Sequence, residues 1–215
     1  VVNHLTAMLP DNDEHFLALP YGLHWSEAKS SDFLVADFDG NVISGVGEVE
    51  PSNLNIHGAI HKEVPRARAI LHSHQPNITA LTLLKDQTVT MSSQHALRFA
   101  ERMAYLDVYG DPADPAIGDT IVDSLKTKDV LMCANHGVIV SRPYLWDAFD
   151  DLYFLDRACE IQLKAMYTGR ELNIMPEAIA NDYGRKIIKW SKIEGEKHFI
   201  ALRRIYHKKY PDLVQ

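Results

Sequence analysis

Apolar and polar residues alternate along several short segments of the chain, which is the pattern of half-buried β-strands. Strands are expected in five segments: 15–20, 33–45, 67–74, 88–91 and 130–140. Two of these segments contain a turn sequence at their middle, Asp-Gly-Asn at 39–41 and Asn-His-Gly at 135–137. Each is therefore expected to form two strands joined by a tight turn.

Other segments repeat apolar residues every three or four positions, which predicts amphipathic helices. Helices are expected over 50–65, 76–84, 92–104, part of 111–129, 143–168 and 176–208. Gly169 is well placed to end the helix over 143–168. Because strands and helices mix without strict β-α-β alternation, the sequence predicts a layered α/β sandwich with a largely antiparallel sheet. The chain is expected to be one domain over 1–215.

Composition narrows the possible partners. The 215 residues carry a formal net charge of −7 and no block rich in Lys or Arg, so neither nucleic acid nor an anionic membrane surface is expected as a partner. No apolar run is long enough for a bilayer span, and the first residues show no secretory signal. Cys133 and Cys159 fit no disulfide framework or zinc motif, so we interpret them as buried thiols of a cytoplasmic protein.

Histidines are the compositional oddity, with 11 in the chain. His72 and His74 lie two residues apart on a predicted strand, so their imidazoles project from one face and can share a metal ion. The alternative is a pair of hydrogen-bonded core histidines. His136 lies in the turn at 135–137 and could present a third ligand. Three His ligands with open positions are typical of a catalytic metal site.

Several segments resemble one family. The stretches LHSHQPNITALTLL (71–84), NHGVIV (135–140) and AFDDLYFLDRACEIQLKA (148–165) are together similar to the class II aldolase/adducin family, which includes fuculose-phosphate aldolase and ribulose-phosphate 4-epimerase. Residues 16–42 are most similar to its adducin-like bacterial branch. The resemblance extends to about residue 168. It implies a three-layer αβα sandwich, a homotetramer with sites between subunits, and an opening helix upstream of Val1.

The resemblance also implies site residues. The equivalents of His72, His74 and His136 hold a divalent metal, for which Zn²⁺ is expected first and Fe²⁺, Mn²⁺ or Co²⁺ are alternatives. The family's acid/base carboxylate corresponds to Asn53, which cannot take up a proton. Glu48 and Glu50 are nearby alternatives for that role.

The phosphate-binding segments of the family are altered here. Asn3, Gly22 and Ser52 remain as candidate substrate-binding residues beside Tyr21, but several hydroxyl-bearing and small residues are absent. Because a phosphate dianion needs several converging donors, an unphosphorylated or carboxylate-bearing substrate is expected. In the aldolases a tyrosine of the neighbouring subunit donates a proton. Tyr105 is the first candidate for this role and Tyr109 the second.

Further polar residues have weaker claims. His57 and His61 have a helical metal-binding spacing, but the resemblance fills the ligand set without them and favours a packing role. His95 and Arg98 could line the pocket or lie on a helix surface. Four aspartates in one predicted helix are expected on its solvated face: Asp147, Asp150, Asp151 and Asp156.

These observations favour a metal-dependent lyase that acts on a small carbonyl or hydroxy-acid substrate. A non-haem iron oxygenase on the same scaffold is a second hypothesis, although no clear carboxylate ligand is present. A non-catalytic, adducin-like interaction domain is the third. The substitution at Asn53 favours this domain, whereas the three retained histidines favour an enzyme.

Overall fold

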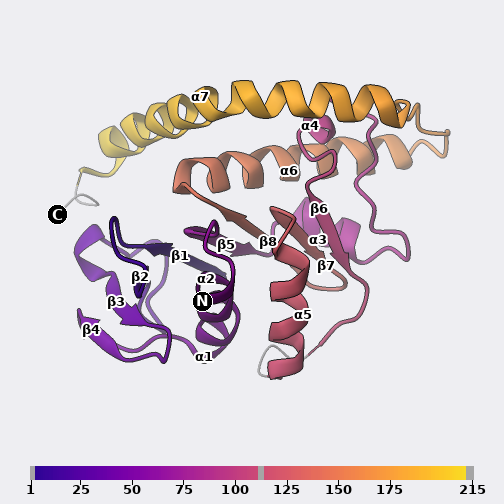
Figure 1. Cartoon of the computed structure of the whole chain (residues 1–215). Helices are drawn as coiled ribbons and strands as arrows, with labels where there is room; N and C mark the ends of the chain where they lie inside the picture. The colour runs from indigo at the N-terminus through magenta and orange to yellow at the C-terminus, as the bar shows by residue number, and fades with distance from the viewer. Residues whose placement is uncertain (1–2, 111–113, 212–215) are drawn as a thin grey trace.

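The computed structural model describes residues 3–110 and 114–211, and within these ranges eight strands form one sheet (Figure 1). The strand order is β4-β3-β2-β1-β5-β8-β7-β6. All neighbours are antiparallel except β6 and β7, which are parallel. The strands are β1 (His4–Met8), β2 (His15–Ala18), β3 (Leu34–Asp37), β4 (Val42–Ser44), β5 (Ala69–Ser73), β6 (Met103–Leu106), β7 (Val130–Cys133) and β8 (Gly137–Arg142).

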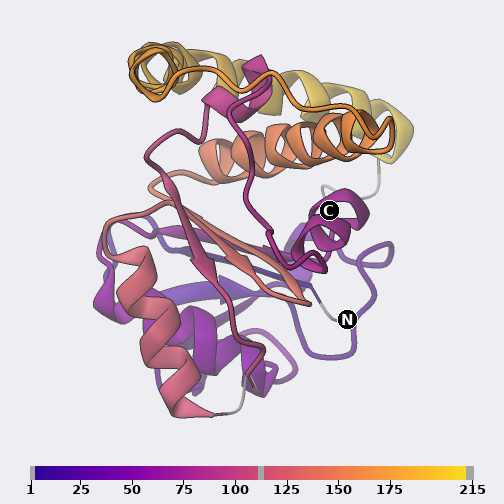
Figure 2. The same cartoon turned by 90° about the vertical axis from the view of Figure 1, so that its right-hand side faces the viewer.

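Helices cover both faces of this sheet (Figure 2). One face is covered by α5 and by a continuous helical segment made of α1, a π-helical turn η2 and α2; the other is covered by α3, α4 and α6. The long helix α7 packs on the outside of α6. The helices are η1 (Ser30–Asp32, 3-10), α1 (Pro51–Asn53), η2 (Leu54–Gly58), α2 (Ala59–Glu63), α3 (Pro76–Thr82), α4 (Gln94–Leu97), α5 (Pro115–Leu125), α6 (Leu145–Met166) and α7 (Glu177–Lys209). The expected αβα sandwich with a mostly antiparallel sheet is confirmed.

The core is divided by the sheet. On one face of the sheet, Leu155 of α6 and Ile78 of α3 pack against the strands. On the other face, Ile60 of α2 and Leu125 of α5 pack in one cluster with Ile139 of β8. Alternate residues of β5 therefore face different helices. Ile70 belongs to the α2–α5 side, so His72, two residues further along the same strand, also faces that side.

Two local predictions were wrong, and one strand was missed. Strand β1 was not predicted, although it pairs with both β2 and β5 near the middle of the sheet. Residues 88–91 form no strand. The helix expected over 92–104 is limited to α4, because Met103–Leu106 instead pairs with β7 as a parallel edge strand.

The prediction that the aspartates of α6 form a solvated face was also wrong. Asp147, Asp150 and Asp151 are buried rather than solvated, and Asp156 is half-buried and accepts a hydrogen bond from the amide of Asn77 at 3.0 Å. The three buried carboxylates face arginines from other elements. Both cysteines are free and buried, as predicted. No helix in the described part of the chain is both long and apolar enough to cross a bilayer.

Candidate metal centre

Three histidines from two neighbouring strands meet at one end of the sheet. His72 lies in β5, His74 directly follows that strand, and His136 lies in the turn between β7 and β8. Because β5 pairs with β8, the end of β5 and the turn before β8 are adjacent. The strand pairing thus brings together side chains that are more than sixty residues apart.

The geometry of these rings is that of a ligand cluster. One nitrogen from each histidine lies within 4.8 Å of the other two, and the Nε2 atoms of His72 and His74 are 3.0 Å apart. Two nitrogens bound to one tetrahedral zinc ion are separated by about 3.3 Å, given Zn–N distances of about 2.0–2.1 Å. The cluster therefore has the dimensions that a divalent ion requires.

Hydrogen bonds and burial set the protonation of the cluster. The Nδ1–H of His72 donates to the carbonyl of Val138 at 3.0 Å, which leaves its Nε2 lone pair free. Burial lowers the pKa of His72 to about 3 and also lowers the pKa values of His74 and His136. All three rings are therefore neutral at physiological pH, the state in which imidazole binds metal.

Gly137 allows His136 to approach the other two histidines. A Cβ at this position would lie 2.5 Å from the carbonyl oxygen of Ser73 and 2.9 Å from the ring of His74. The turn itself is made by Asn135, which has a φ of 57°. Glycine is needed at 137 because β5 lies so close, and the positive φ belongs to Asn135.

A second group of polar residues lies beside the cluster. His4 on β1 is directly opposite His72 in the β1–β5 register, and their ring centroids are 5.7 Å apart. The Nε2 of His4 is 3.3 Å from the carboxylate of Glu50. That carboxylate also accepts hydrogen bonds from the Ser52 hydroxyl and from the backbone N–H of Asn53. Glu50 therefore caps α1 and orients His4 at the same time.

The pKa of Glu50 is lowered by its contacts. Partial burial opposes ionisation, but the hydrogen bonds from Ser52 and Asn53 and the neighbouring His4 outweigh it. Glu48, the other carboxylate considered, is exposed. Of the two, Glu50 is the one that lies at the site.

His57 and His61 form a relay with Thr6 that fixes the proton on His57. The Nδ1–H of His61 donates to the carbonyl of Ala67 at 2.7 Å, so its neutral ring must accept at Nε2. The Thr6 hydroxyl lies 2.8 Å from that Nε2 and 2.8 Å from Nδ1 of His57. Having donated its single proton to His61, Thr6 accepts from His57 Nδ1–H. The buried Nε2 of His57 is thus an unprotonated acceptor without a partner among the described residues.

This relay predicts a pH dependence of stability. Burial lowers the pKa of His61 to about 4, whereas the unfolded chain has the ordinary value of 6.5. Between these values the unfolded state takes up a proton that the folded state does not, so stability falls as pH is lowered from 6.5 to 4, by about 3 kcal/mol from this residue. Urea unfolding of the protein and of His61→Asn across this range should show a shallower slope in the variant. Equal slopes would contradict a neutral His61.

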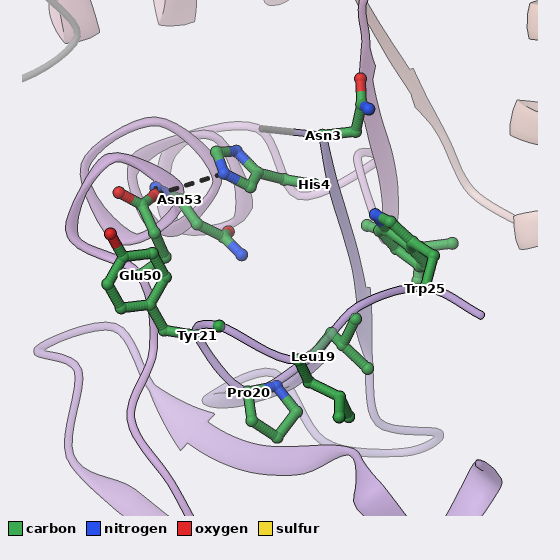
Figure 3. A pocket seen from close by; sticks show the side chains of 11 residues that line it. Asn3, His4, Leu19, Pro20, Tyr21, Trp25, Glu50 and Asn53 are labelled. Carbon is green, nitrogen blue, oxygen red and sulfur yellow. Dashed lines mark hydrogen bonds and ion pairs between the residues drawn. The ribbon is translucent and has the colours of Figure 1, made fainter. Parts of the chain in front are cut away.

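A pocket beside the cluster brings together most of the predicted substrate-binding residues (Figure 3). Its lining comes from the start of β1, the segment after β2 and the start of α1: Asn3, His4, Leu5, Leu19, Pro20, Tyr21, Gly22, Leu23, Trp25, Glu50 and Asn53. Ser52 is joined to it through Glu50. Asn3 is tied to the cluster, because its side-chain oxygen accepts from the backbone N–H of His74 at 2.8 Å.

Among the described residues, Asn53 is one of several at the pocket that have a buried and unpaired polar side-chain atom. It is buried, and its side-chain oxygen has no partner within the described ranges. Figure 3 shows its amide turned toward the space between Tyr21 and Trp25. Nδ1 of His4 is likewise without a partner in the part of the chain that is described. These two atoms and Nε2 of His57 are buried polar atoms available to a bound ligand or water.

The two tyrosine candidates lie on different sides of the sheet. The ring of Tyr109 is 5.9 Å from that of His136, and both residues line a largely apolar hollow next to the cluster. Tyr105 packs against the core on the α6 side, and its hydroxyl accepts from the backbone N–H of Val89 at 3.2 Å. Within one chain, Tyr109 is therefore the tyrosine near the cluster. A role of Tyr105 toward a neighbouring subunit stays a prediction.

His95 and Arg98 do not lie at the metal cluster. The ring of His95 lies 5.2 Å from that of Phe154 on α6, and Arg98 is buried against Asp150. Both residues thus belong to the α4–α6 contact.

Comparison with known proteins agrees with this architecture. The family model described as "Class II Aldolase and Adducin N-terminal domain" matches residues 1–163. The chain belongs to the class II aldolase and adducin family. Alpha-adducin of Rattus norvegicus is 30% identical over 171 residues, which is 77% of this chain but only 23% of that protein. Class II aldolases use a divalent metal, and the three-histidine cluster is the corresponding candidate site.

Two solved structures share the fold over nearly the whole chain. An aldolase II superfamily protein from Pseudomonas syringae has a TM-score of 0.88 and 27% identity, covering 99% of this chain and 86% of that one. The L-fuculose 1-phosphate aldolase from Glaciozyma antarctica has a TM-score of 0.85 and 26% identity, covering 100% of this chain and 84% of that one. The likeness therefore includes α7, which lies beyond the family match.

Sequence reasoning missed His4 and Thr6. Both lie on β1, and the stretch His-Leu-Thr-Ala-Met alternates polar and apolar residues as a strand does. That alternation was the available signal.

Proposed function

We propose that this chain is a metal-dependent lyase of the class II aldolase type, acting on a small carbonyl or hydroxy-acid substrate without phosphate. The observation that carries the proposal is the cluster of three neutral imidazoles within 4.8 Å, bordered by two pockets. The Nδ1–H of His72 is used by the backbone carbonyl of Val138, so its Nε2 is the nitrogen that faces the other two rings. Three imidazole nitrogens that converge on one point are arranged as ligands of a common ion are.

The donor set supports a divalent metal. His72, His74 and His136 would hold Zn²⁺, the metal we propose first, and would also accept Fe²⁺, Mn²⁺ or Co²⁺. When bound, such an ion acts as a Lewis acid toward a substrate carbonyl or hydroxyl oxygen. Within the described residues the cluster contains no carboxylate, so the two-His-one-carboxylate set of non-haem iron oxygenases is incomplete. This ranks the lyase above the oxygenase.

The acid/base role must come from residues other than Asn53. Glu50 is the carboxylate that lines the pocket, and its lowered pKa keeps it ionised and able to accept a proton. We assign it the role of proton acceptor. Tyr109, beside His136, is the proposed proton donor, with Tyr105 of a neighbouring subunit as the alternative.

The pocket chemistry supports a substrate without phosphate. Among the described residues its lining contains no lysine or arginine, and Glu50 would repel a dianion. Tyr21, Trp25 and Pro20 offer apolar surface for a carbon skeleton. The unpaired side-chain oxygen of Asn53 can accept a hydrogen bond from a substrate hydroxyl.

Family members are often oligomeric, and we propose a homotetramer for this chain. Its two free, buried cysteines agree with a cytoplasmic location.

An activity screen tests the proposal. Protein loaded separately with Zn²⁺, Fe²⁺, Mn²⁺ or Co²⁺ is assayed against a panel of aldehydes, hydroxy-ketones and keto-acids, with phosphorylated and unphosphorylated forms side by side and O₂ consumption recorded. We expect cleavage or decarboxylation of an unphosphorylated compound. Robust turnover of fuculose-phosphate or ribulose-phosphate would contradict the substrate class.

Absence of turnover in every metal form would favour the second candidate function, an adducin-like interaction domain. Two observations favour that candidate specifically: the uncharged Asn53 and the similarity to alpha-adducin. The three-histidine cluster argues against it.

Restoring a carboxylate at position 53 gives a further prediction. Asn53→Glu is expected to tighten metal binding by about 10-fold, because a negative charge is added beside a cation held by neutral ligands. It should not create activity on sugar phosphates, because the pocket still lacks phosphate donors. Competition with a fluorescent chelator measures the affinity. The matched control is Asn55→Glu on the exposed side of the same helix; equal tightening by both variants would mean that the effect is not local.

A further inference from the structure

Helix α7 has an inner face made mostly of small residues. Spaced three or four apart, these residues are buried against α4 and α6: Ala180, Gly184, Ile187, Ser191 and Gly195. A Cβ at Gly184 would lie 2.8 Å from the carbonyl of Leu97, which shows how closely α7 approaches α4. The inner face is therefore fully used by the fold.

A different stripe of α7 carries large apolar residues that remain in solvent. We call Ile179, Tyr183, Trp190, Ile193 and Ile200 the α7 seam; their side chains are 41–61% exposed. Together with Lys186 and Lys197 they follow alternating spacings of four and three residues, which is the pattern of a coiled-coil contact line. The helix has 33 residues, and a helix of that length extends about 50 Å.

The seam adjoins a hollow of about 300 Å³ between α4 and α7. Tyr183 and Trp190 of the seam and Leu97 of α4 form part of its wall. An exposed apolar stripe of this length beside a groove is typical of an interaction surface.

The charges along one flank of the seam indicate the partner. Asp182, Lys189, Glu196 and Arg203 are spaced seven residues apart, are all exposed and alternate in sign. If the same helix of a second copy lies antiparallel, Asp182 faces Arg203 of that copy, and Lys189 faces Glu196. A two-fold axis repeats each pair, so four complementary pairs form.

The apolar positions match in the same register. Trp190 faces Ile193 of the second copy, and Tyr183 faces Ile200. Lys186 lies opposite Lys197 of the second copy, which is the one like-charge pair of this register. Asp182, 2.6 Å from Lys186 in its own chain, is shared between Lys186 and Arg203 of the second copy and reduces this repulsion. A parallel pair would leave only Lys189 beside an opposite charge, Glu194. The antiparallel arrangement is therefore the self-complementary one.

We propose that the α7 seam is a self-association surface, paired antiparallel with the α7 seam of a second copy of this chain. The seam lies on the side of the sheet opposite the metal cluster, so this association leaves the cluster and its pockets open. The proposal does not depend on the proposed enzymatic function.

Sedimentation equilibrium tests the surface. Trp190→Glu is expected to weaken self-association at least 10-fold, because it places a charge at the centre of the apolar line. Val46→Glu, at a residue that is 91% exposed on the β4 side of the molecule, is the control and should have no effect. Metal content should be the same in all three proteins.

A charge exchange tests the register without altering the apolar seam. Lys189→Glu should weaken association, and adding Glu196→Lys in the same chain should restore it, because the pairs re-form with reversed signs. These two positions are seven residues apart and cannot rescue each other within one chain. Loss without restoration would overturn the antiparallel register.

Orientation can be measured directly. A spin label on Glu177→Cys, at the exposed start of α7, should give an inter-label distance of about 45 Å in the antiparallel pair, from a rise of 1.5 Å per residue. The native cysteines are buried and should not react. The proposal would be overturned by a short inter-label distance, as in a parallel pair, or by association that Trp190→Glu leaves unchanged. A protein that is monomeric at about 0.1 mM would also overturn it.

Discussion

Asp151→Ala is expected to lower the free energy of unfolding by about 3–5 kcal/mol, the range for breaking a buried ion pair from one side. The Asp151 carboxylate is buried and accepts two hydrogen bonds from the guanidinium of Arg102, with a third nitrogen from Arg142 at 3.4 Å. The pKa of Arg102 is raised: burial opposes its charge, but Asp151 and Asp129 outweigh it. Removing Asp151 leaves that buried charge without half of its compensation.

The surrounding network makes relaxation difficult. Four arginines face four aspartates in this region: Arg66, Arg98, Arg102 and Arg142, with Asp129, Asp147, Asp150 and Asp151. The charges balance, so a single deletion leaves a net positive charge that water cannot easily reach.

Urea unfolding measures the effect. Asp123→Ala is the matched control, because its pair with Lys126 is exposed and such pairs contribute about 0–1 kcal/mol. Asp151→Asn keeps the shape and one acceptor, so it should lie between the two and remains measurable if the alanine variant does not fold. A loss below about 1 kcal/mol for Asp151→Ala would mean that the network contributes little.

The double variant His72→Ala with His74→Ala is expected to lose stoichiometric metal. The Nε2 atoms of His72 and His74 are 3.0 Å apart, so the double change removes two of the three ligands and leaves only His136. The affinity should fall by more than the about 100-fold that accompanies loss of an outer hydrogen-bonding partner of a ligand. Elemental analysis of protein purified without chelator measures it.

His24→Ala is the matched control. His24 is exposed and bonded to Ser26 at 2.7 Å, so its loss should leave the metal content unchanged. One equivalent of metal per chain in the double variant would show that the ligands lie elsewhere.

Local patterns predicted the elements that define the cluster. The strand that carries His72 and ends just before His74, the turn with His136 and the helix α6 all follow from periodicity and turn residues within each segment. The short strand β6 was missed, and its first two residues were included in the helix expected over 92–104, because its stability comes from pairing with β7, which no local pattern encodes.

Burial of polar residues was less predictable, because their partners are far away in the sequence. Three aspartates of α6 were predicted on a solvated face, since the arginines that neutralise them come from the end of α4 (Arg98), from β8 and from the segment before β6. Thr6 faces inward toward His57 and His61. These partners lie 51 and 55 residues further along the chain, so no local pattern could indicate the contact. Only the fold places these charges and donors together.

The metal cluster joins residues of β5 to the turn before β8, so it links metal binding to the alignment of these two strands during folding. In the unfolded chain only His72 and His74 are close together, whereas His136 joins them when β5 and β8 are paired with His72 opposite Ile139. A slip of one residue would turn His72 of β5 to the other face of the sheet. A bound ion would therefore stabilise the native β5–β8 register over registers shifted by one residue. Metal uptake during folding would thus favour the correct strand pairing at the centre of the sheet.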